Sequence, residues 1–353
     1  MKVSVSRAIC LSSLAWLTMQ AYADGPSAYA LIDGGVASSK ITGTNTSTSQ
    51  TEFVTGGVVP NFVGFKLDKT TDGLTVGVQL EQGFSLNSSK SSGSYYAFGN
   101  GDILNRQKNI FVKSSAGSFV FGVQPNIAFG NVLMGDPRGG SNYGSSLAMI
   151  NGNGGLGTVD TASLSYTSPS LSGLTVGVQY VPQSSKTAGE VKTGSRLAAT
   201  YANGPLTLGI SNYSNTVVDK KDSTGTILAA NYKLGSFTLK GISASQKTDT
   251  YTDALKTNGI GGAYALNEKM SFDIGYYKST SGISNFKVDT TGVGAYYNIT
   301  KDLKFYGQYA VVDNKGSANG VGWNFAGPTI FAYAFDAGQK ATTVNAGLIF
   351  SYF

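Results

Sequence analysis

The chain contains no histidine, and its one cysteine, Cys10, lies near the amino terminus. The absence of histidine excludes Ser-His-Asp hydrolysis, catalysis by an imidazole base and most zinc or haem ligation. If Cys10 is removed with an export signal, the exported chain also has no disulfide, thiol nucleophile or thiolate metal site. The sequence therefore predicts no cofactor, no metal site and no enzymatic activity.

Charge and proline are also scarce. Charged residues make up 13% of the chain, whereas a soluble domain carries roughly a quarter. The formal charge is +6, and about +4 without Lys2 and Arg7, which is too small to indicate a nucleic-acid partner. After residue 23 no apolar run reaches the roughly 18 residues that a membrane-spanning helix needs. Few prolines and abundant Gly, Tyr and Phe favour a long β meander over a helical or mixed fold.

The first 23 residues have the pattern of a secretory signal peptide. Lys2 and Arg7 provide a basic start, residues 8–19 are mostly apolar, and Ala21-Tyr22-Ala23 supplies a small-x-small cleavage pattern. We expect residues 1–23 to be removed on export and residues 24–353 to form one domain.

Beyond the expected signal peptide the dominant period is two. In residues 74–80 the apolar side chains fall on even positions and small or polar ones on odd positions. The same alternation recurs in residues 118–124, 174–180, 206–211 and 270–276. One apolar face opposite a face of Gly, Thr, Ser, Gln and Asp predicts a strand between lipid and water.

Turn signals alternate with longer polar stretches. Short turns are expected at Asp72-Gly73, Ala116-Gly117, residues 170–173, Asn203-Gly204, Leu234-Gly235, Asn267-Glu268 and residues 300–302. Longer loops are expected at residues 39–52, 87–105, 126–157, 182–193, 215–223, 248–255, 280–286 and 314–339. Short turns on one side and long loops on the other are typical of outer-membrane barrels.

The sheet must close because the interior of a membrane is hydrocarbon. In hydrocarbon every backbone N–H and C=O group must be paired, and only a closed sheet has no edge. We therefore predict an all-β fold, a transmembrane antiparallel β-barrel of about sixteen strands that is wide enough for an aqueous channel. Interfacial girdles are expected from Tyr95, Tyr96, Tyr232, Tyr276, Tyr277, Tyr296, Tyr297, Tyr306, Tyr309 and Tyr352.

Particular segments point to a family. Residues 79–84 (Gln-Leu-Glu-Gln-Gly-Phe) are the most specific, and residues 29–36, 61–66, 106–112, 118–124 and 159–180 match at the level of pattern. Together with the terminal Phe353, they resemble the trimeric porins of Gram-negative bacteria, of the Neisseria and Burkholderia type, over nearly the whole chain. The resemblance implies an outer-membrane homotrimer whose long third loop folds into the lumen and narrows it. The implied partners are outer-membrane lipid, lipopolysaccharide, and small polar solutes and ions.

The chain departs from that family at three places. The family usually has an arginine on the second strand and often another at the end of the fifth, where this chain has Phe62 and Val123. Strong anion preference in the family depends on such arginines, so the resemblance does not extend that preference to this chain. In the last strand, residues 344–352 place apolar side chains on even positions, which puts Phe353 on the opposite face unless a bulge intervenes.

Selectivity in a porin depends on charge and width at a constriction. The candidate selectivity residues are Asp136, Arg138, Glu81, Arg106, Lys66 and Asp33. The first two are the only charged residues of the third loop, residues 126–157. The alternation along its strand predicts that Glu81 points into the lumen. The resemblance to the porin family implies the same orientation for Arg106, Lys66 and Asp33. An acid on the loop opposite bases on the wall would produce a transverse field.

Each candidate also has a purely structural alternative. Asp136 and Arg138 could form a surface pair that stabilises the loop. Glu81 could pair with Lys66 only to hold the wall together. Lys66 and Arg106 could instead lie at an interface between subunits.

The leading functional hypothesis is a passive, water-filled channel for small hydrophilic solutes and ions. A substrate-specific channel with a lumenal binding site is the main alternative, and Tyr277, Tyr296 and Tyr306 could face such a site. A barrel enzyme is disfavoured because histidine is absent, and a β-solenoid adhesin because the chain lacks a regular repeat.

Overall fold

The computed structural model describes residues 25–43, 46–86, 103–153, 155–182, 191–218, 222–248, 253–282, 285–317 and 336–353. The expected signal peptide, and Tyr95 and Tyr96 of the expected girdle, lie outside the described residues.

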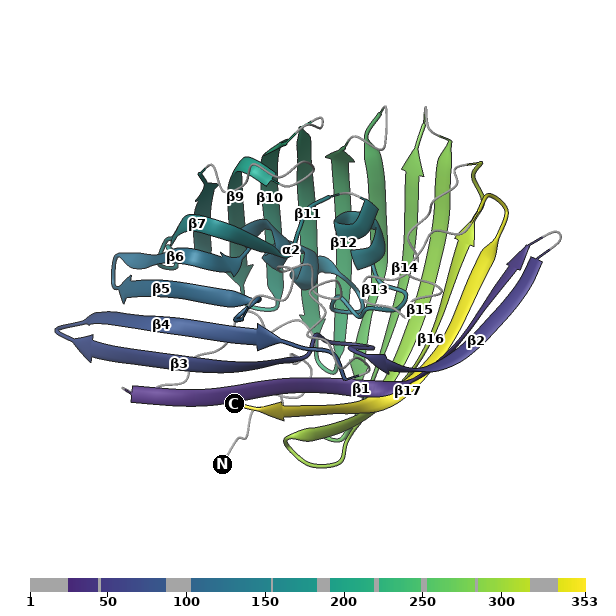
Figure 1. Cartoon of the computed structure of the whole chain (residues 1–353), viewed down its shortest axis with the longest axis horizontal. Helices are drawn as coiled ribbons and strands as arrows, with labels where there is room; N and C mark the ends of the chain where they lie inside the picture. Colours follow the sequence, from purple (N-terminus) through teal and green to yellow (C-terminus); the bar gives the residue numbers. More distant parts are fainter. Residues whose placement is uncertain are drawn as a thin grey trace.

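Within this part of the chain the backbone forms seventeen antiparallel strands (Figure 1). They are β1 (Gly25–Gly43), β2 (Thr46–Thr55), β3 (Phe62–Thr71), β4 (Leu74–Gly83), β5 (Gln107–Ser114), β6 (Gly117–Pro125), β7 (Val159–Thr167), β8 (Leu174–Val181), β9 (Val191–Asn203), β10 (Leu206–Val217), β11 (Ser223–Leu234), β12 (Phe237–Lys247), β13 (Leu255–Ala265), β14 (Met270–Ser281), β15 (Phe286–Asn298), β16 (Leu303–Asn314) and β17 (Lys340–Tyr352).

The sheet closes through the long strand β1. One edge of β1 pairs with β17, the last strand. Its other edge pairs with β3 over Gly25–Leu31 and with β2 over Gly34–Gly43. Because β2 and β3 follow one another along the same edge, they share one place in the barrel. The seventeen strands therefore occupy sixteen positions, which confirms the predicted barrel.

The expected first loop is wrong in its extent. Most of residues 39–52 belongs to β1 and β2, which pair from Gly34↔Thr55 to Gly43↔Thr46. This segment is rich in Ser and Thr, and that composition led to the prediction of a polar loop. Threonine is β-branched and suits an extended backbone, so the hairpin continues as a polar extension of the sheet.

The predicted two-residue alternation is present on the strands. Val76 on β4, Phe121 on β6 and Ile274 on β14 are exposed on the outer surface of the barrel. Their neighbours Gly77 and Asp273 are buried on the opposite, inner face. The apolar outer face is the one that contacts lipid, and the polar inner face lines the lumen.

The turn at Asp72-Gly73 shows how the short connections are made. Both residues have positive φ, 52° and 77°, as a type I′ hairpin turn requires. The twist of this turn matches that of the flanking strands β3 and β4, so the chain reverses direction between them without a longer loop.

The expected girdle is correct for some tyrosines and wrong for others. Tyr232, Tyr276, Tyr297, Tyr309 and Tyr352 are exposed on the outer face. Tyr277, Tyr296 and Tyr306 are buried on the lumen side. Adjacent residues of a strand point to opposite faces, so one member of each of the pairs Tyr276-Tyr277 and Tyr296-Tyr297 must point inward. Tyr306 is not part of such a pair and lies on the inward face of β16.

The carboxyl-terminal residue lies beyond the end of β17. The Phe353 ring stacks on Tyr29 with centroids 6.4 Å apart and an interplanar angle of 21°. Tyr29 is a buried, inward residue of β1. Phe353 therefore lies on the face opposite to the outward-facing Tyr352, as its position in the sequence predicts.

In the described ranges, no helix combines the length and the apolar character needed to cross a membrane.

The assignment of outer and inner faces can be tested on β11. Leu228→Arg places a charge at the middle of the strand on the lipid-facing side, where Leu228 is 49% exposed. We expect it to lower the free energy of unfolding from lipid by about 2–4 kcal/mol. Asn231→Arg adds the same side chain to the inner face of the same strand and should cost much less. Denaturant titrations of both variants in vesicles would measure the difference, and equal losses would contradict the assignment.

Candidate functional site in the barrel lumen

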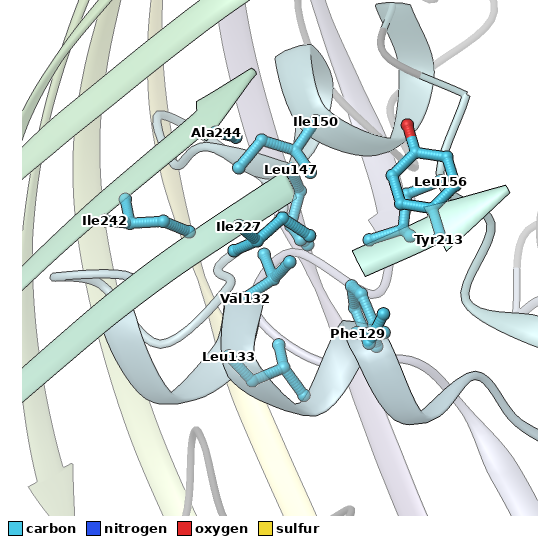
Figure 2. Packing of buried hydrophobic residues seen from close by; sticks show 11 residues of the cluster. Phe129, Val132, Leu133, Leu147, Ile150, Leu156, Tyr213, Ile227, Ile242 and Ala244 are labelled. Atoms are coloured by element: carbon cyan, nitrogen blue, oxygen red, sulfur yellow. The ribbon is translucent and has the colours of Figure 1, made fainter. Parts of the chain in front are cut away.

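The third loop, residues 126–157, packs against the inner face of the barrel. It contains α2 (Ile127–Gly135) and the short π-helix η2 (Ala148–Asn153). Asn126 caps α2 by accepting a hydrogen bond from the Ala128 backbone N–H at 2.9 Å. The apolar side chains of both helices pack with inward residues of β10, β11 and β12 (Figure 2): Phe129, Val132, Leu133, Ile150, Tyr213, Ile227, Ile242 and Ala244.

The contact between α2 and the wall is close. A Cβ atom at Gly135 would lie 2.6 Å from the Ala229 Cβ and 2.8 Å from the Gly241 carbonyl oxygen, so only glycine fits. Asn131 donates hydrogen bonds to the Ser211 Oγ at 2.6 Å and to the Ile210 carbonyl at 3.0 Å. These contacts fix the helix to β10 and β11.

Asp136, at the end of α2, is fully buried and organises the loop. Its Oδ1 accepts hydrogen bonds from the Arg138 and Gly140 backbone N–H groups, at 2.8 and 3.2 Å, and from the Tyr277 hydroxyl at 2.9 Å. Its Oδ2 accepts from the backbone N–H and the hydroxyl of Ser146, at 2.9 and 2.5 Å. This carboxylate therefore joins two parts of the loop to β14, and is not part of a surface pair.

Arg138 links the same loop to the wall. Its Nε lies 2.8 Å from the Asp273 Oδ1 on β14, and its Nη2 donates to the Gln308 Oε1 on β16 at 2.9 Å. Its Nη1 donates to the Tyr143 carbonyl. Burial is the largest single influence and would lower the pKa of the Arg138 guanidinium, but the Asp273 carboxylate and the neighbouring Tyr296 and Tyr277 together raise the pKa, so the side chain stays charged.

The middle of the loop reaches the first strands of the chain. Tyr143 packs in a buried cluster with Ala37, Val54 and Ala310, which belong to β1, β2 and β16. Since α2 contacts β10–β12, the loop touches widely separated parts of the inner wall. Figure 1 shows α2 drawn inside the curve of the sheet.

Glu81 and Arg106 form an ion pair on the wall. The Arg106 Nε lies 3.3 Å from the Glu81 Oε2, and both side chains are almost completely buried. Tyr29 donates its hydroxyl to the Glu81 Oε1 at 2.9 Å. The alternative that paired Glu81 with Lys66 is wrong, because the Lys66 Nζ lies 2.8 Å from the Asp68 Oδ2 instead.

Asp33 binds a chain segment inside the barrel that was not predicted from the sequence. Residues 56–61, here called the inner segment, connect β2 to β3. The Asp33 Oδ2 accepts hydrogen bonds from the Val58 and Val59 backbone N–H groups at 2.7 and 2.9 Å. Its Oδ1 accepts from the Tyr306 hydroxyl at 2.8 Å. The two valines pack in a buried cluster with inward residues of the wall, which places the inner segment inside the barrel.

A cavity of about 670 Å³ lies beside the inner segment and opens towards the turns that precede β14 and β16. Leu31, Val58, Val59 and Ile349 form an apolar part of its lining. Arg138, Lys240 and Lys304 contribute basic groups, and Asp273 contributes the carboxylate that binds Arg138. The Lys304 Nζ lies 5.8 Å from the centre of the Tyr296 ring.

Thus the six candidates all have buried side chains, and they fall into separate groups. Asp136 and Arg138 lie together in the third loop, Glu81 binds Arg106, Lys66 binds Asp68, and Asp33 holds the inner segment. Sequence reasoning missed Asp273, although its place on the polar face of residues 270–276 could have indicated an inward acid. It also missed the Asp160–Arg196 pair, whose atoms approach to 2.6 Å, because that contact depends on cross-strand register.

The closed barrel with its internal loop defines a transmembrane β-barrel channel. The model of the Gram-negative porin family matches residues 10–317, so this chain belongs to the Gram-negative porin family. It is an outer-membrane porin whose strands cross the membrane many times. Comparison with curated protein sequences gave no match.

Solved structures share the fold at low sequence identity. The anion-selective porin from Comamonas acidovorans is 19% identical, with a TM-score of 0.77 over 93% of this chain and 99% of that one. OmpF of Salmonella typhi, in complex with daunomycin, is 15% identical, with a TM-score of 0.66 over 95% and 100% of the two chains. OmpT of Vibrio cholerae is 14% identical, with a TM-score of 0.61 over 95% and 100%.

The role of Asp136 in holding the third loop can be tested by Asp136→Ala. The change leaves buried donors without an acceptor, each at a cost of about 1–3 kcal/mol, so the loop should detach from β14. We expect noisier single-channel currents and an altered conductance in planar bilayers. Tyr277→Phe removes one of the five donors and should have a much smaller effect. Identical currents from the wild type and Asp136→Ala would show that the loop is held by other contacts.

Proposed function

We propose that this porin is a general diffusion channel with only a weak preference between anions and cations. The observation that supports this proposal is the pairing of the basic candidates with carboxylates. Lys66 lies beside Asp68, Arg106 beside Glu81, and Arg138 beside Asp273. A row of basic groups without acidic neighbours would concentrate anions in the pore, whereas paired charges largely cancel over the distance that a passing ion experiences.

We further infer that the third loop and the inner segment together set the width of the pore. Gln308 contacts both, because its Oε1 accepts from Arg138 and its Nε2 donates to the Gly57 carbonyl at 2.8 Å. Asn142 of the loop also donates to the Gly56 carbonyl. In this proposal Asp33 and Asp136 act by positioning backbone, since their oxygens are already occupied by hydrogen bonds. Any local field from the wall comes from the dipoles of the Glu81–Arg106 and Arg138–Asp273 pairs, in which the opposite charges largely cancel.

The proposed working unit is a homotrimer of chains comprising residues 24–353, in contact with outer-membrane lipid and lipopolysaccharide. The resemblance to trimeric porins supports this assembly, and OmpT of Vibrio cholerae, which shares the fold, is described in a trimer form. A passive channel, as opposed to a barrel enzyme, is supported by the absence of histidine from the whole sequence.

A substrate-specific channel is the second candidate, and the cavity beside the inner segment favours it. The cavity combines an apolar wall with Lys240 and Lys304, which would suit a small organic anion. The three inward tyrosines give less support, because their hydroxyls bind Asp136, Asp273 and Asp33. Saturable block of the current by one class of solute would favour this candidate over general diffusion.

The reversal potential across a tenfold KCl gradient tests the main proposal. For a weakly selective channel we expect a magnitude far below the roughly 59 mV of an ideally selective one. Glu81→Gln removes the partner of Arg106 and should shift the potential towards anion selectivity. Asp72→Asn removes the same charge from an exposed turn and should leave the potential nearly unchanged. A near-ideal wild-type potential would contradict weak selectivity, and folded protein without conductance would contradict the channel itself.

A further inference from the structure

The cavity beside the inner segment carries a net positive charge. Five basic and three acidic side chains line it. Half of these eight belong to the turns at its opening, and their charges cancel: Glu268, Lys269, Lys301 and Asp302. The other four belong to the inner wall and the third loop, where Arg138 and Asp273 form an ion pair. The excess charge therefore comes from Lys240 of β12 and Lys304 of β16.

Lys304 lies beside apolar and aromatic side chains. Strand register places it directly opposite Ile349 of β17 on one side and Asn298 of β15 on the other. Its Nζ lies 5.8 Å from the centre of the Tyr296 ring. Among the residues that the structure describes, no carboxylate lies within 4.0 Å of this ammonium group. Lys304 has thus lost part of its hydration without gaining a counter-charge.

The acids that line the cavity do not neutralise Lys304. The Asp273 Oδ1 binds Arg138 at 2.8 Å, and its Oδ2 accepts a hydrogen bond from the Tyr296 hydroxyl at 2.6 Å. The Asp302 Oδ2 lies 3.0 Å from the Lys301 Nζ. Glu268 is exposed in the turn before β14, where water screens its charge. An anion that enters the cavity therefore meets a basic group whose charge is not cancelled locally.

An apolar wall completes the cavity. Leu31, Val58, Val59 and Ile349 belong to one buried hydrophobic cluster and line the cavity. Since Ile349 is the register partner of Lys304, this wall begins directly beside the ammonium group. The volume of about 670 Å³ falls within the roughly 300–1,000 Å³ of small-molecule sites. Such sites pack the ligand against hydrophobic side chains and orient it with a few polar groups.

We propose that this cavity is a binding subsite for amphipathic monocarboxylates, which are small organic acids with one carboxylate on a compact apolar body. The carboxylate binds at Lys304, Lys240 adds attraction, and the body packs against Val58, Val59 and Ile349. The cavity opens towards the short turns, which in outer-membrane barrels lie on the periplasmic side, so the ligand enters from that side. The inference rests on the proposed channel and gives its organic-anion candidate a defined site and ligand class.

Single-channel recording of the refolded barrel with three probes tests the subsite. Benzoate has both features of the proposed ligand, acetate has only the carboxylate, and benzyl alcohol has only the apolar body. On the turn side, benzoate should block the KCl current saturably, at a concentration at least about tenfold below that needed with either other probe, because it alone uses both parts of the site. Equal block by benzoate and acetate would overturn the proposal.

Variants of two neighbouring lysines assign the site. Lys304→Met removes the charge and keeps a long side chain, so the half-blocking concentration of benzoate should rise at least about tenfold. Lys304→Arg keeps the charge and should retain most of the block. Lys301→Met is the matched control, because Lys301 is 89% exposed at the same opening, and it should change the value less than about twofold. Unchanged block in Lys304→Met would refute the assignment.

The KCl conductance distinguishes this inference from the channel function. Normal conductance without benzoate block would reject the subsite and leave the channel intact, whereas folded, inserted protein without conductance would reject the channel. If Lys304→Met does not fold, the three probes on the wild type still decide, together with Val58→Thr. That change removes apolar surface at nearly constant volume and should weaken the block by benzoate severalfold while leaving that by acetate unchanged.

Discussion

The constraint on which the structure depends is that backbone polar groups have no partner in hydrocarbon. A membrane-spanning sheet must therefore close, and here closure rests on β1, which pairs with β17 on one edge and with β2 and β3 on the other. Because β2 and β3 share one position in the barrel, the residues between them do not pair with a neighbouring strand. Those residues form the inner segment, so the way in which the barrel closes also supplies part of the lumen.

Closure also determines the chemistry of the two faces. The outer face needs only apolar side chains. Outward residues alternate along each strand with inward residues, and every polar group on the inner face must find a hydrogen-bonding partner. Ion pairs such as Glu81–Arg106 and Asp160–Arg196 meet this requirement on the wall. Charged groups here are buried without being isolated, and each has hydrogen-bonding partners that offset its lost hydration. In the proposed function, the same pairing limits how strongly the wall can favour one sign of ion.

The third loop depends on packing as much as on charge. Its helices bury apolar side chains against β10–β12, while Asp136 and Arg138 connect its turn to β14 and β16. A loop with only two charged residues therefore uses both of them for its own placement. What remains for a passing solute is the surface that the loop and the inner segment leave open, including a cavity with apolar and basic lining.

The sequence by itself determined the class of fold, because a period of two and alternating turns and loops are local patterns that a barrel of this size must have. Parity likewise predicted that Glu81 points inward and that Phe353 lies opposite Tyr352. Only the tertiary structure decided which charges meet, since Arg106 and Glu81 come together through the register of β4 with the residues before β5. The inner segment also could not be predicted from the sequence. Residues 56–61 differ from an ordinary surface loop only through contacts with Asp33 and Gln308, which are remote in the chain.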